Sequence, residues 1–504
     1  MLDALLQGLV AVLQWNALSF MLIGIVVGFW VGLLPGIGGA TTLALMLPFV
    51  YKMAPVQAFA FLLGMHSVTA TTGDITSILF GIPGEGVSAA LVLDGYAMAK
   101  KGEAGRALGA NLMSSLIGAL VGAAALALAI PVVRPLVLTF GSPEFFMLAI
   151  LGIAFIASLS GRGPRAMVRG FLAGCLGLFF AAVGHDPQAG ILRYTLGQLY
   201  LWEGLGLVPV LVGFFAIPEI VDLAVRGTAI AGDAPMGRIS GVLDGVKDAF
   251  RHFWLTIRCS LIGTYIGIMP GLGGGVAQWI AYAHAVQSAR NVTEREGFGK
   301  GDVRGVLGPG AANNSKEGGA LIPTVAFGVP GSSAMAILLG GFFLVGLVPG
   351  PDMLTKHLDV TFSMVWTIVL ANVITVAASF ALLNHLAKLT TIRGSLLIPF
   401  LVLLTSLGAY TNNNNIGDLV VALAFGALGY LMVRYRWPRA PLVLGLVLGE
   451  IAERYLWIST ARYGVAWLGR PVVILLLLLT VVVVAAPFIQ ERRARGHKEA
   501  LRAA

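Results

Sequence analysis

The chain has 504 residues, of which 57% are hydrophobic and 11% carry a charge, and its mean hydropathy is +0.88. A soluble domain carries about 25% charged residues, so this composition excludes a soluble globular protein and predicts a helical membrane protein with several crossings. The net charge of +9 is explained by Lys and Arg in cytoplasmic loops, where these residues concentrate in membrane proteins, rather than by nucleic-acid binding.

Residues 1–16 predict a short N-terminal helix. The stretch reads MLDALLQGLVAVLQWN and has neither a basic region ahead of its apolar core nor a clear small-residue cleavage site, so we expect it to be retained.

The stretch from Leu18 to Leu47 carries no charged side chain but contains the phrase GLLPGIGG at 32–39. Proline and glycine in its middle should break a helix. Non-helical backbone is tolerated at membrane depth only where protein or a water-filled cavity surrounds it. We therefore predict a re-entrant hairpin whose tip lies at 35–39.

A broken crossing is expected next, over 54–99, with PGEG at 83–86 as the break. Four helices then complete the first half, and the basic clusters at their ends are placed inside. These helices are predicted at 107–130, 143–160, 166–183 and 205–225. Together these elements form a first transmembrane repeat, 17–226, and a cytoplasmic connector follows at 227–257.

The second half repeats the two unusual phrases. GIMPGLGG at 267–274 matches GLLPGIGG, and AFGVPG at 326–331 matches LFGIPG at 79–84, in the same order. The stretch 259–289 leaves and returns between basic clusters within about 30 residues, whereas two full helices need about 40. A second re-entrant hairpin is therefore predicted, with its tip at 270–275.

The rest of the second half also follows the first. A broken crossing is expected with its break at 330–333, and four helices are predicted at 360–387, 394–408, 416–433 and 440–455. The second repeat then covers 258–456, an extra C-terminal helix covers 457–490, and a basic cytoplasmic tail covers 491–504.

Each half thus contains a hairpin, a broken crossing and four helices. After the hairpin this gives five crossings, and an odd number turns the second copy upside down, as in transporters built from inverted repeats. The predicted fold class is an all-α polytopic membrane protein with two inverted structural repeats, each with a re-entrant hairpin and a broken helix, and about 10–12 membrane segments.

The broken helices predict a binding site. Helix N-termini attract anions and freed carbonyl groups coordinate Na⁺, so two pairs of related breaks indicate one central site for an anion and a coupling cation. Lys316 is the candidate countercharge for a carboxylate, and Asp74 or Glu85 the candidate group for a cation or proton. Na⁺ is also expected at the PGxGG tips, at Gly36, Gly38, Gly271 and Gly273.

The candidate substrate- and ion-binding residues lie beside the four breaks. They are Gly36, Gly38, Gly39, Thr41, Thr72, Gly73, Asp74, Pro83, Gly84, Glu85, Gly271, Gly273, Gly274, Asn313, Asn314, Ser315, Lys316, Pro330, Gly331, Ser332 and Ser333. Simpler interpretations stand beside this one. Asn313–Glu317 could cap a helix at the membrane surface, and Lys316 could pair with Glu317 or reach the interface. His66 is interpreted as a packed polar residue or a hydrogen-bonding contact between helices, rather than as a ligand or proton carrier.

The chain carries no enzyme signature. It has no P-loop, which excludes ATP as its direct energy source, and its seven histidines are scattered singly rather than spaced for a metal. We predict no catalytic residues, no enzymatic activity and no cofactor. The coupling ion is expected to be Na⁺ or H⁺.

Four phrases carry a resemblance to a known family. They are GLLPGIGGATTLALMLP, TTGDITSILFGIPGEGVSAALVLDGYAMAKKGEAGRALG, GIMPGLGGGVAQWIAYAHA and AANNSKEGGALIPTVAFGVPGSSAMAILLGGFFLVGLVPG. In this order, across residues 22–350, the sequence resembles the large membrane subunit of tripartite tricarboxylate transporters. The family-like positions are Gly36, Gly38, Gly39, Pro83, Gly84, Gly271, Gly273, Gly274, Asn313, Asn314, Pro330 and Gly331. GEG at 84–86 and GPGAANN at 308–314 depart from the commonest family pattern, so citrate and other carboxylates both stay open as substrates.

The resemblance implies a multi-pass secondary transporter of the bacterial inner membrane. It would import an organic di- or tricarboxylate, citrate-like, that a periplasmic substrate-binding protein delivers, together with a small four-helix membrane subunit. Uptake would run as symport with Na⁺ or H⁺ by elevator-like alternating access. Membrane lipid is an expected partner, nucleic acid is not, and homo-oligomerisation is left open. The alternative function is a passive organic-anion channel with the PGxGG tips as its filter.

Overall fold

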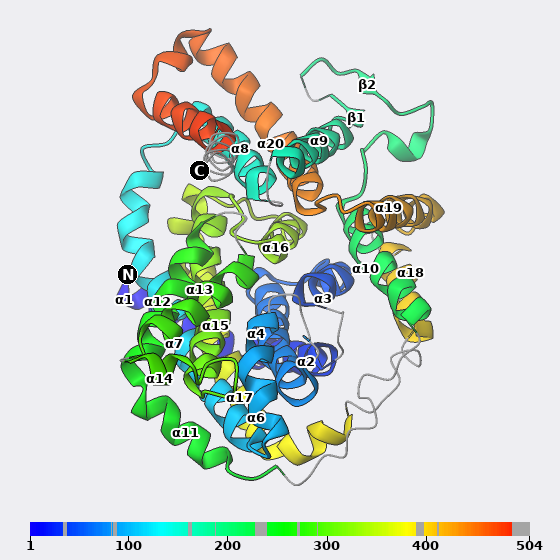
Figure 1. The fold of residues 1–504 in the computed structure, drawn as a ribbon. Coiled ribbons are helices and arrows are strands. Elements are labelled where there is room, and N and C mark those ends of the chain that lie inside the picture. Colours follow the sequence, from blue (N-terminus) through cyan, green and yellow to red (C-terminus); the bar gives the residue numbers. More distant parts are fainter. Residues whose placement is uncertain are drawn as a thin grey trace, which may run out of the picture.

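The structure is a computed structural model. It describes residues 1–33, 38–81, 83, 88–159, 164–186, 188–226, 239–269, 273–289, 291–389, 398–410 and 413–485. The described chain is mostly helical (Figure 1). The strands β1 (Gly184–His185) and β2 (Leu192–Arg193) pair antiparallel in one small sheet, with Gly184 opposite Arg193.

The α-helices are given in chain order. They are α1 (Leu2–Leu13), α2 (Trp15–Gly32), α3 (Gly39–Met46), α4 (Pro55–Phe80), α5 (Ala89–Leu91), α6 (Ala97–Lys100), α7 (Ala104–Val137), α8 (Ser142–Leu159), α9 (Pro164–Ala181), α10 (Leu207–Arg226), α11 (Val242–Arg251), α12 (Phe253–Ile268), α13 (Gly273–Gln287), α14 (Val292–Arg295), α15 (Arg304–Phe327), α16 (Ser333–Leu344), α17 (Leu358–Leu389), α18 (Ile398–Tyr410), α19 (Ile416–Arg434) and α20 (Ala440–Tyr463). A last helix covers Pro471–Ala485.

Among the described residues, four helices are long and apolar enough to cross a membrane by length and composition. They are Trp15–Gly32, Ala104–Val137, Leu358–Leu383 and Ile416–Arg434. Shorter apolar helices accompany them, including α12, α16 and α18. These findings agree with an all-α membrane protein.

Helices α4 and α15 form the centre of the molecule. Each is buried along nearly its whole length, over residues 58–79 in α4 and 305–326 in α15. The two helices contact each other, and each has its own neighbours: α4 packs against α2 and α17, while α15 packs against α12 and α7. This central group lies in the lower part of Figure 1.

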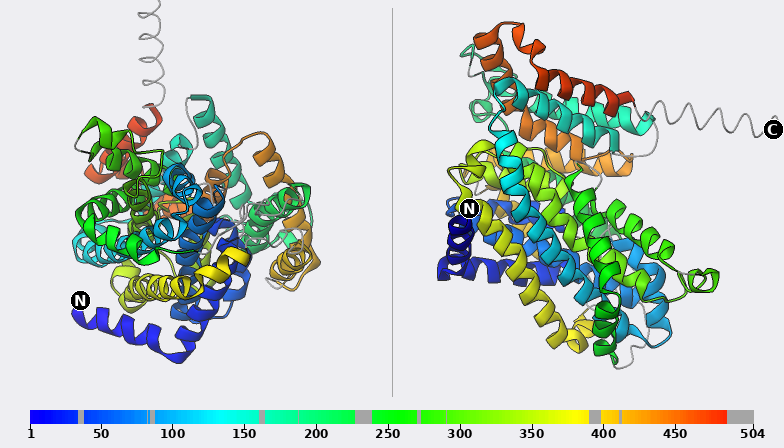
Figure 2. Two further views of the ribbon diagram at one scale, coloured as in Figure 1. Left: turned by 60° about the horizontal axis from the view of Figure 1, so that its bottom comes forward. Right: turned by 90° about the vertical axis from the view of Figure 1, so that its left-hand side faces the viewer.

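Two outer groups of helices flank this centre. In one, α20 packs against α8 and α9; in the other, α10 packs against α18 and α19. Figure 1 shows the first group at the top and the second at the right, and the side view in Figure 2 shows the first group above the central helices. Helices α3 and α16, which contact each other, lie between the centre and the outer groups.

Glycines bring the central helices into close contact. A Cβ atom at Gly28 of α2 would lie 2.3 Å from the carbonyl oxygen of Met65 in α4. In α12, a Cβ atom at Gly267 would lie 2.3 Å from the carbonyl oxygen of Lys316 in α15. Small residues let helix backbones approach in this way. The high glycine content of the chain therefore has a packing role at these two contacts.

Helices α4 and α15 end in the same way. Gly81 follows α4 with φ +68° and ψ 16°, and Gly328 follows α15 with φ +68° and ψ 17°. The Gly81 amide donates to Ser77 and the Gly328 amide to Thr324, both at 3.1 Å. Only glycine adopts this left-handed conformation cheaply, so it stops both helices just before the Pro-Gly pairs. The helix ends thus lie where the two predicted breaks begin.

Two predicted helix ends were wrong. Helix α7 continues through Pro131 to Val137, although it was predicted to end near residue 130. Proline is tolerated within membrane helices because neighbouring groups satisfy the freed backbone. Helix α20 continues to Tyr463 rather than ending near 455. The residue that ends it is Gly464, with φ +58°. Within the helix, Arg454 donates to Glu450, one turn earlier, at 3.2 Å.

Candidate functional site

Many polar side chains lie in the buried centre where α4 meets α15. In α4, the hydroxyl groups are largely satisfied within their own helix. Thr72 donates to the carbonyl of Val68 at 2.9 Å, and Ser77 donates to that of Gly73 at 3.1 Å. Such bonds to the preceding turn keep a hydroxyl compatible with a buried helix. The charged and amide side chains, in contrast, reach across to other helices.

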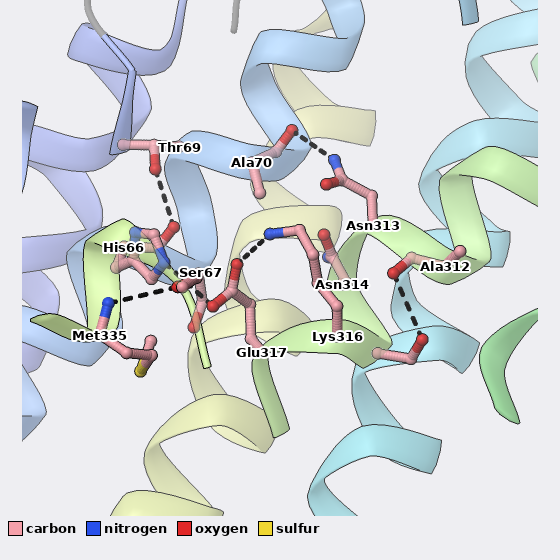
Figure 3. A network of polar contacts seen from close by, with 12 residues as sticks. His66, Ser67, Thr69, Ala70, Ala312, Asn313, Asn314, Lys316, Glu317 and Met335 are labelled. Atoms are coloured by element: carbon pink, nitrogen blue, oxygen red, sulfur yellow. Dashed lines mark hydrogen bonds and ion pairs between the residues drawn. The ribbon is translucent and has the colours of Figure 1, made fainter. Parts of the chain in front are cut away.

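Glu317 of α15 joins the two central helices. Its Oε2 lies 3.0 Å from Nε2 of His66 in α4, and its Oε1 accepts a hydrogen bond from Nζ of Lys316 (Figure 3). The side chains of His66 and Glu317 are each 6% exposed and that of Lys316 is 10% exposed. A buried ion pair is costly and only weak evidence for stability. Ionisable groups at membrane depth usually mark a function.

Asp74 of α4 forms a second contact between the helices. The Nδ2 atom of Asn313 lies 3.2 Å from both carboxylate oxygens of Asp74 and 3.3 Å from the carbonyl oxygen of Ala70. The Nδ2 atom of Asn111, on α7, lies 3.3 Å from Oδ2 of Asp74. Asp74, Asn111 and Asn313 are all 0% exposed. Three helices therefore meet at one carboxylate.

Asn314 extends the network to a fourth helix. Its Nδ2 donates to Oγ1 of Thr71 at 2.8 Å and to Oδ1 of Asn372, on α17, at 2.7 Å. Asn372 in turn donates to the carbonyl of Ile368 at 2.9 Å. The network thus joins α4 and α15 to the long helices α7 and α17.

Some acceptors in this network are unused. Within the described part of the chain, the Oδ1 atoms of Asn111, Asn313 and Asn314 and the Nδ1 atom of His66 are buried and have no hydrogen-bond partner. A buried polar atom without a partner is costly, and it calls for a specific explanation. The three amide oxygens are acceptors, and they are suited to a ligand that supplies donors or positive charge.

The described ends of both predicted hairpins lie beside this network. A Cβ atom at Gly39, the first residue of α3, would lie 2.6 Å from Nδ1 of His66. On the other side, Gly267 contacts the backbone of Lys316, and a Cβ atom at Gly331 would lie 2.5 Å from the carbonyl oxygen of Gly267. The cluster therefore lies between segments that the sequence predicted as hairpins.

The structure brings one set of predicted residues together. Thr72, Gly73 and Asp74 lie in α4, and Asn313, Asn314, Ser315 and Lys316 lie in α15. The interpretation of Asn313–Glu317 as a cap at the membrane surface was wrong, because this stretch lies in the middle of α15 and is buried. Lys316 pairs with Glu317, as one of the alternatives had it.

The other predicted residues lie at helix starts and connections. Gly38, Gly39 and Thr41 lie at the start of α3, Gly273 and Gly274 begin α13, and Pro330, Gly331, Ser332 and Ser333 connect α15 to α16. Ser332 caps α16, because its Oγ accepts the amide of Met335 at 3.2 Å. Pro83 follows α4. Gly36, Gly84, Glu85 and Gly271 lie outside the described residues.

Sequence reasoning missed several members of the network. Asn111 and Asn372 were not singled out, and Glu317 was considered only as a partner of Lys316 or as part of a cap at the surface. His66 does form a hydrogen-bonded contact between helices, as one of its two interpretations had it. Both asparagines lie within mostly apolar stretches of long helices, α7 and α17. An amide side chain in such a stretch is the signal that could have found them.

Arg304, the first residue of α15, forms hydrogen bonds that fix the start of this helix. The Arg304 guanidinium donates to Asp302 at 2.7 Å and to Glu294 at 2.8 Å, and these hydrogen bonds raise the pKa of Arg304 above its usual value. Asp94, just before α6, accepts the amides of Gly301 at 2.7 Å and Asp302 at 2.9 Å. These contacts fix the entry of α15 and so position the network residues further along the helix.

Comparisons with known proteins agree with the resemblance. Residues 18–444 match the model of the tripartite tricarboxylate transporter TctA family. The chain is also similar to two uncharacterized proteins of Agrobacterium vitis. One, in the TAR-I ttuC' 3' region, is 32% identical over 437 residues, which cover 86% of this chain and 85% of the relative. The other, in the TAR-II ttuC' 3' region, is 34% identical over 194 residues, which cover 38% of this chain and 79% of the relative.

No solved structure matches the chain. The family match covers most of the sequence, including α4, α7, α15 and α17, which carry the buried network. The chain belongs to the tripartite tricarboxylate transporter TctA family and is a membrane subunit of such a transporter.

Proposed function

We propose that this chain is the large permease subunit that imports an organic di- or tricarboxylate, citrate-like, across the bacterial inner membrane. A periplasmic binding protein delivers the carboxylate, and a small membrane subunit completes the complex. The observation that carries the proposal is the buried group of Lys316, Glu317 and His66 at the contact of α4 and α15. The family match supports a transport role for a chain that holds it.

Lys316 is the group proposed to bind a carboxylate of the substrate. An ammonium group has three donor positions, and within the described residues Lys316 uses its ammonium only toward Glu317. A hydrogen bond to a charged group contributes about 1.5–3 kcal/mol to binding. The other donor positions are open to a substrate carboxylate. That carboxylate would share the single positive charge of Lys316 with Glu317, so the negative charge of Glu317 opposes substrate binding.

Alternating access is the proposed mechanism, with two inverted repeats as its basis. Matching helix pairs support it: α4 packs on α17 as α15 packs on α7, and α10 packs on α19 as α20 packs on α9. Each pair takes one helix from each proposed repeat. In this mechanism the centre of the molecule, with the network and the hairpins, moves past the outer helices and exposes Lys316 to each side in turn.

Uptake by the reconstituted complex tests the proposed function. Proteoliposomes that hold the chain and its small membrane subunit are given the binding protein, a labelled tricarboxylate and an imposed Na⁺ or pH gradient. We expect saturable accumulation of label above its external concentration, and loss of accumulation when the gradient is collapsed or the binding protein is omitted.

Two results would contradict this function. If uptake only brings the label to equal concentrations on both sides, and neither the Na⁺ gradient nor the pH gradient changes it, the chain would be a passive anion channel instead. Absence of carboxylate uptake by the complete complex under either gradient, with correct insertion verified, would exclude carboxylate import altogether.

A further inference from the structure

We propose that Asp74, Asn313, Asn111 and the carbonyl of Ala70 form a binding site for a monovalent cation, Na⁺, at the junction of α4, α7 and α15. The inference rests on the proposed function, because it identifies the coupling ion and its place. It differs from the expectation of Na⁺ at the PGxGG tips. The site lies instead between the central helices, in the network that Figure 3 shows in part.

The spacing of the polar atoms suits an ion with oxygen ligands. Three oxygens surround the amide of Asn313: both carboxylate oxygens of Asp74 at 3.2 Å and the carbonyl oxygen of Ala70 at 3.3 Å. Oxygens that bind a cation at about 2.3–2.6 Å lie roughly 3.2–3.6 Å from one another when they are neighbours in its coordination shell. The amide group of Asn313 therefore lies at the distance that a ligand oxygen of the same shell would have.

The unused amide oxygens point to a ligand that is not part of the chain. In both Asn111 and Asn313, the nitrogen donates to Asp74 while the oxygen is buried without a partner among the described residues. Rotating each amide by half a turn exchanges the two atoms. With a cation beside Asp74, both oxygens become ligands, and the buried acceptors are satisfied.

The ligand set favours Na⁺ over divalent or transition metals. It has one carboxylate, two amides and one backbone carbonyl, all oxygen donors, which are the ligands of hard cations. Within the described residues no three His, Cys, Asp or Glu side chains gather as a metal site would require. The single negative charge of Asp74 matches a monovalent ion. Asp74 is 0% exposed, so the site does not hold the water molecules that Mg²⁺ usually retains.

The position of the site explains how an ion couples to substrate. Asn313 binds Asp74, and Lys316, proposed to bind the substrate carboxylate, lies one turn further along α15. An ion that fixes the amide of Asn313 therefore holds α15 against α4 and orders the segment that carries Lys316. Substrate and ion would each bind more tightly in the presence of the other, as reciprocal coupling between sites requires.

Binding of ²²Na⁺ to the purified full-length chain, in detergent and without partners or carboxylate, tests the site. We expect saturable binding by the wild type that Li⁺ displaces better than K⁺. Asp74→Asn should weaken it more than tenfold, and Asn313→Ala and Asn111→Ala should each weaken it severalfold. Asp418→Asn is the matched control, because Asp418 is also 0% exposed but lies in α19, in an outer group. It should bind Na⁺ like the wild type.

A second measurement covers variants that fold poorly. NaCl, compared with choline chloride, should raise the Tm of the wild type and of Asp418→Asn, because an ion that binds only the folded state stabilises it. This Na⁺-dependent shift should be smaller in Asn111→Ala, because weaker Na⁺ binding gives less stabilisation. Unchanged Na⁺ binding in Asp74→Asn, or proton uptake at Asp74 with no Na⁺ binding by the wild type, would overturn the inference.

The assay separates this inference from the proposed function. Loss of Na⁺ binding in Asp74→Asn would stand even if the complete complex transported no carboxylate. Carboxylate uptake that survives with unchanged Na⁺ binding in Asp74→Asn would leave the function in place and remove the site.

Discussion

Glu317 holds Lys316 in the described structure, so its carboxylate competes with the substrate. We predict that Glu317→Gln lowers the Kd for a tricarboxylate about tenfold, a change of about 1.4 kcal/mol, because Lys316 is then free of its internal partner. Isothermal titration calorimetry of the purified chain measures this. Glu450→Gln, which removes an exposed carboxylate paired with Arg454, is the control. Equal or weaker binding by Glu317→Gln would show that Glu317 assists the substrate rather than competing with it.

His66 connects Glu317 to the start of α3, where Gly39 lies against its ring. We predict that Gly39→Ala reduces carboxylate uptake at least tenfold without unfolding the chain. The added Cβ would lie 2.6 Å from both His66 Nδ1 and Thr69 Oγ1, so the imidazole must shift away from Glu317. Uptake rate, read beside the Tm, checks this. Uptake that stays at the wild-type level with an unchanged Tm would show that His66 can move without consequence.

At the scale of elements, glycine contacts set the distance between α2 and α4. A Cβ at Gly28 would lie 2.3 Å from the carbonyl of Met65, and a backbone atom cannot move aside as a side chain can. We predict that Gly28→Ala lowers the free energy of unfolding by about 1–3 kcal/mol, the usual cost of overpacking. Thermal unfolding in detergent checks this. Gly469→Ala is the matched control, because its Cβ would meet nothing within 4 Å. Equal Tm values for the two variants would contradict the close packing.

The ends of the central helices could be predicted from sequence, while their contacts could not. The Pro-Gly pairs at 83–84 and 330–331 predicted a break in each apolar stretch, and α4 and α15 indeed end just before these pairs, at Gly81 and Gly328. Hydropathy does not say which face of a buried helix meets which neighbour, because both helices are buried all around. The contacts of Asn111 with Asp74 and of Asn314 with Asn372 depend on that packing, so they were missed.

The end of a helix was also mispredicted where contacts within the helix extend it beyond the expected residue. Helix α20 was predicted to end near 455, but Arg454 pairs with Glu450 within the helix, and the helix continues to the next glycine, Gly464. Family membership, in contrast, followed from a few phrases, because these motifs recur in a fixed order that composition alone would not produce.

At the scale of the whole molecule, inverted repeats predict that corresponding connections of the two repeats lie on opposite sides of the membrane. The connection between α9 and α10 is predicted outside, and its counterpart between α19 and α20 is predicted inside. In a background of Cys175→Ala and Cys259→Ala, Gln188→Cys should react with a membrane-impermeant maleimide in intact cells. Tyr435→Cys should react only after the membrane is opened. Labelling of both positions in intact cells would place the two connections on one side and exclude inversion.

The central claim is that Lys316 binds the carboxylate of the substrate, and the affinity of a tricarboxylate for Lys316→Gln tests it most directly. Lys356→Gln, which removes an exposed lysine paired with Asp352, is the matched control. The double variant Lys316→Gln with Glu317→Gln keeps the pair neutral and separates loss of binding from loss of folding. We predict that both Lys316 variants bind about 10–150-fold more weakly, as the loss of about 1.5–3 kcal/mol requires, and that Lys356→Gln binds like the wild type. Unchanged affinity in a folded Lys316→Gln variant would contradict the account.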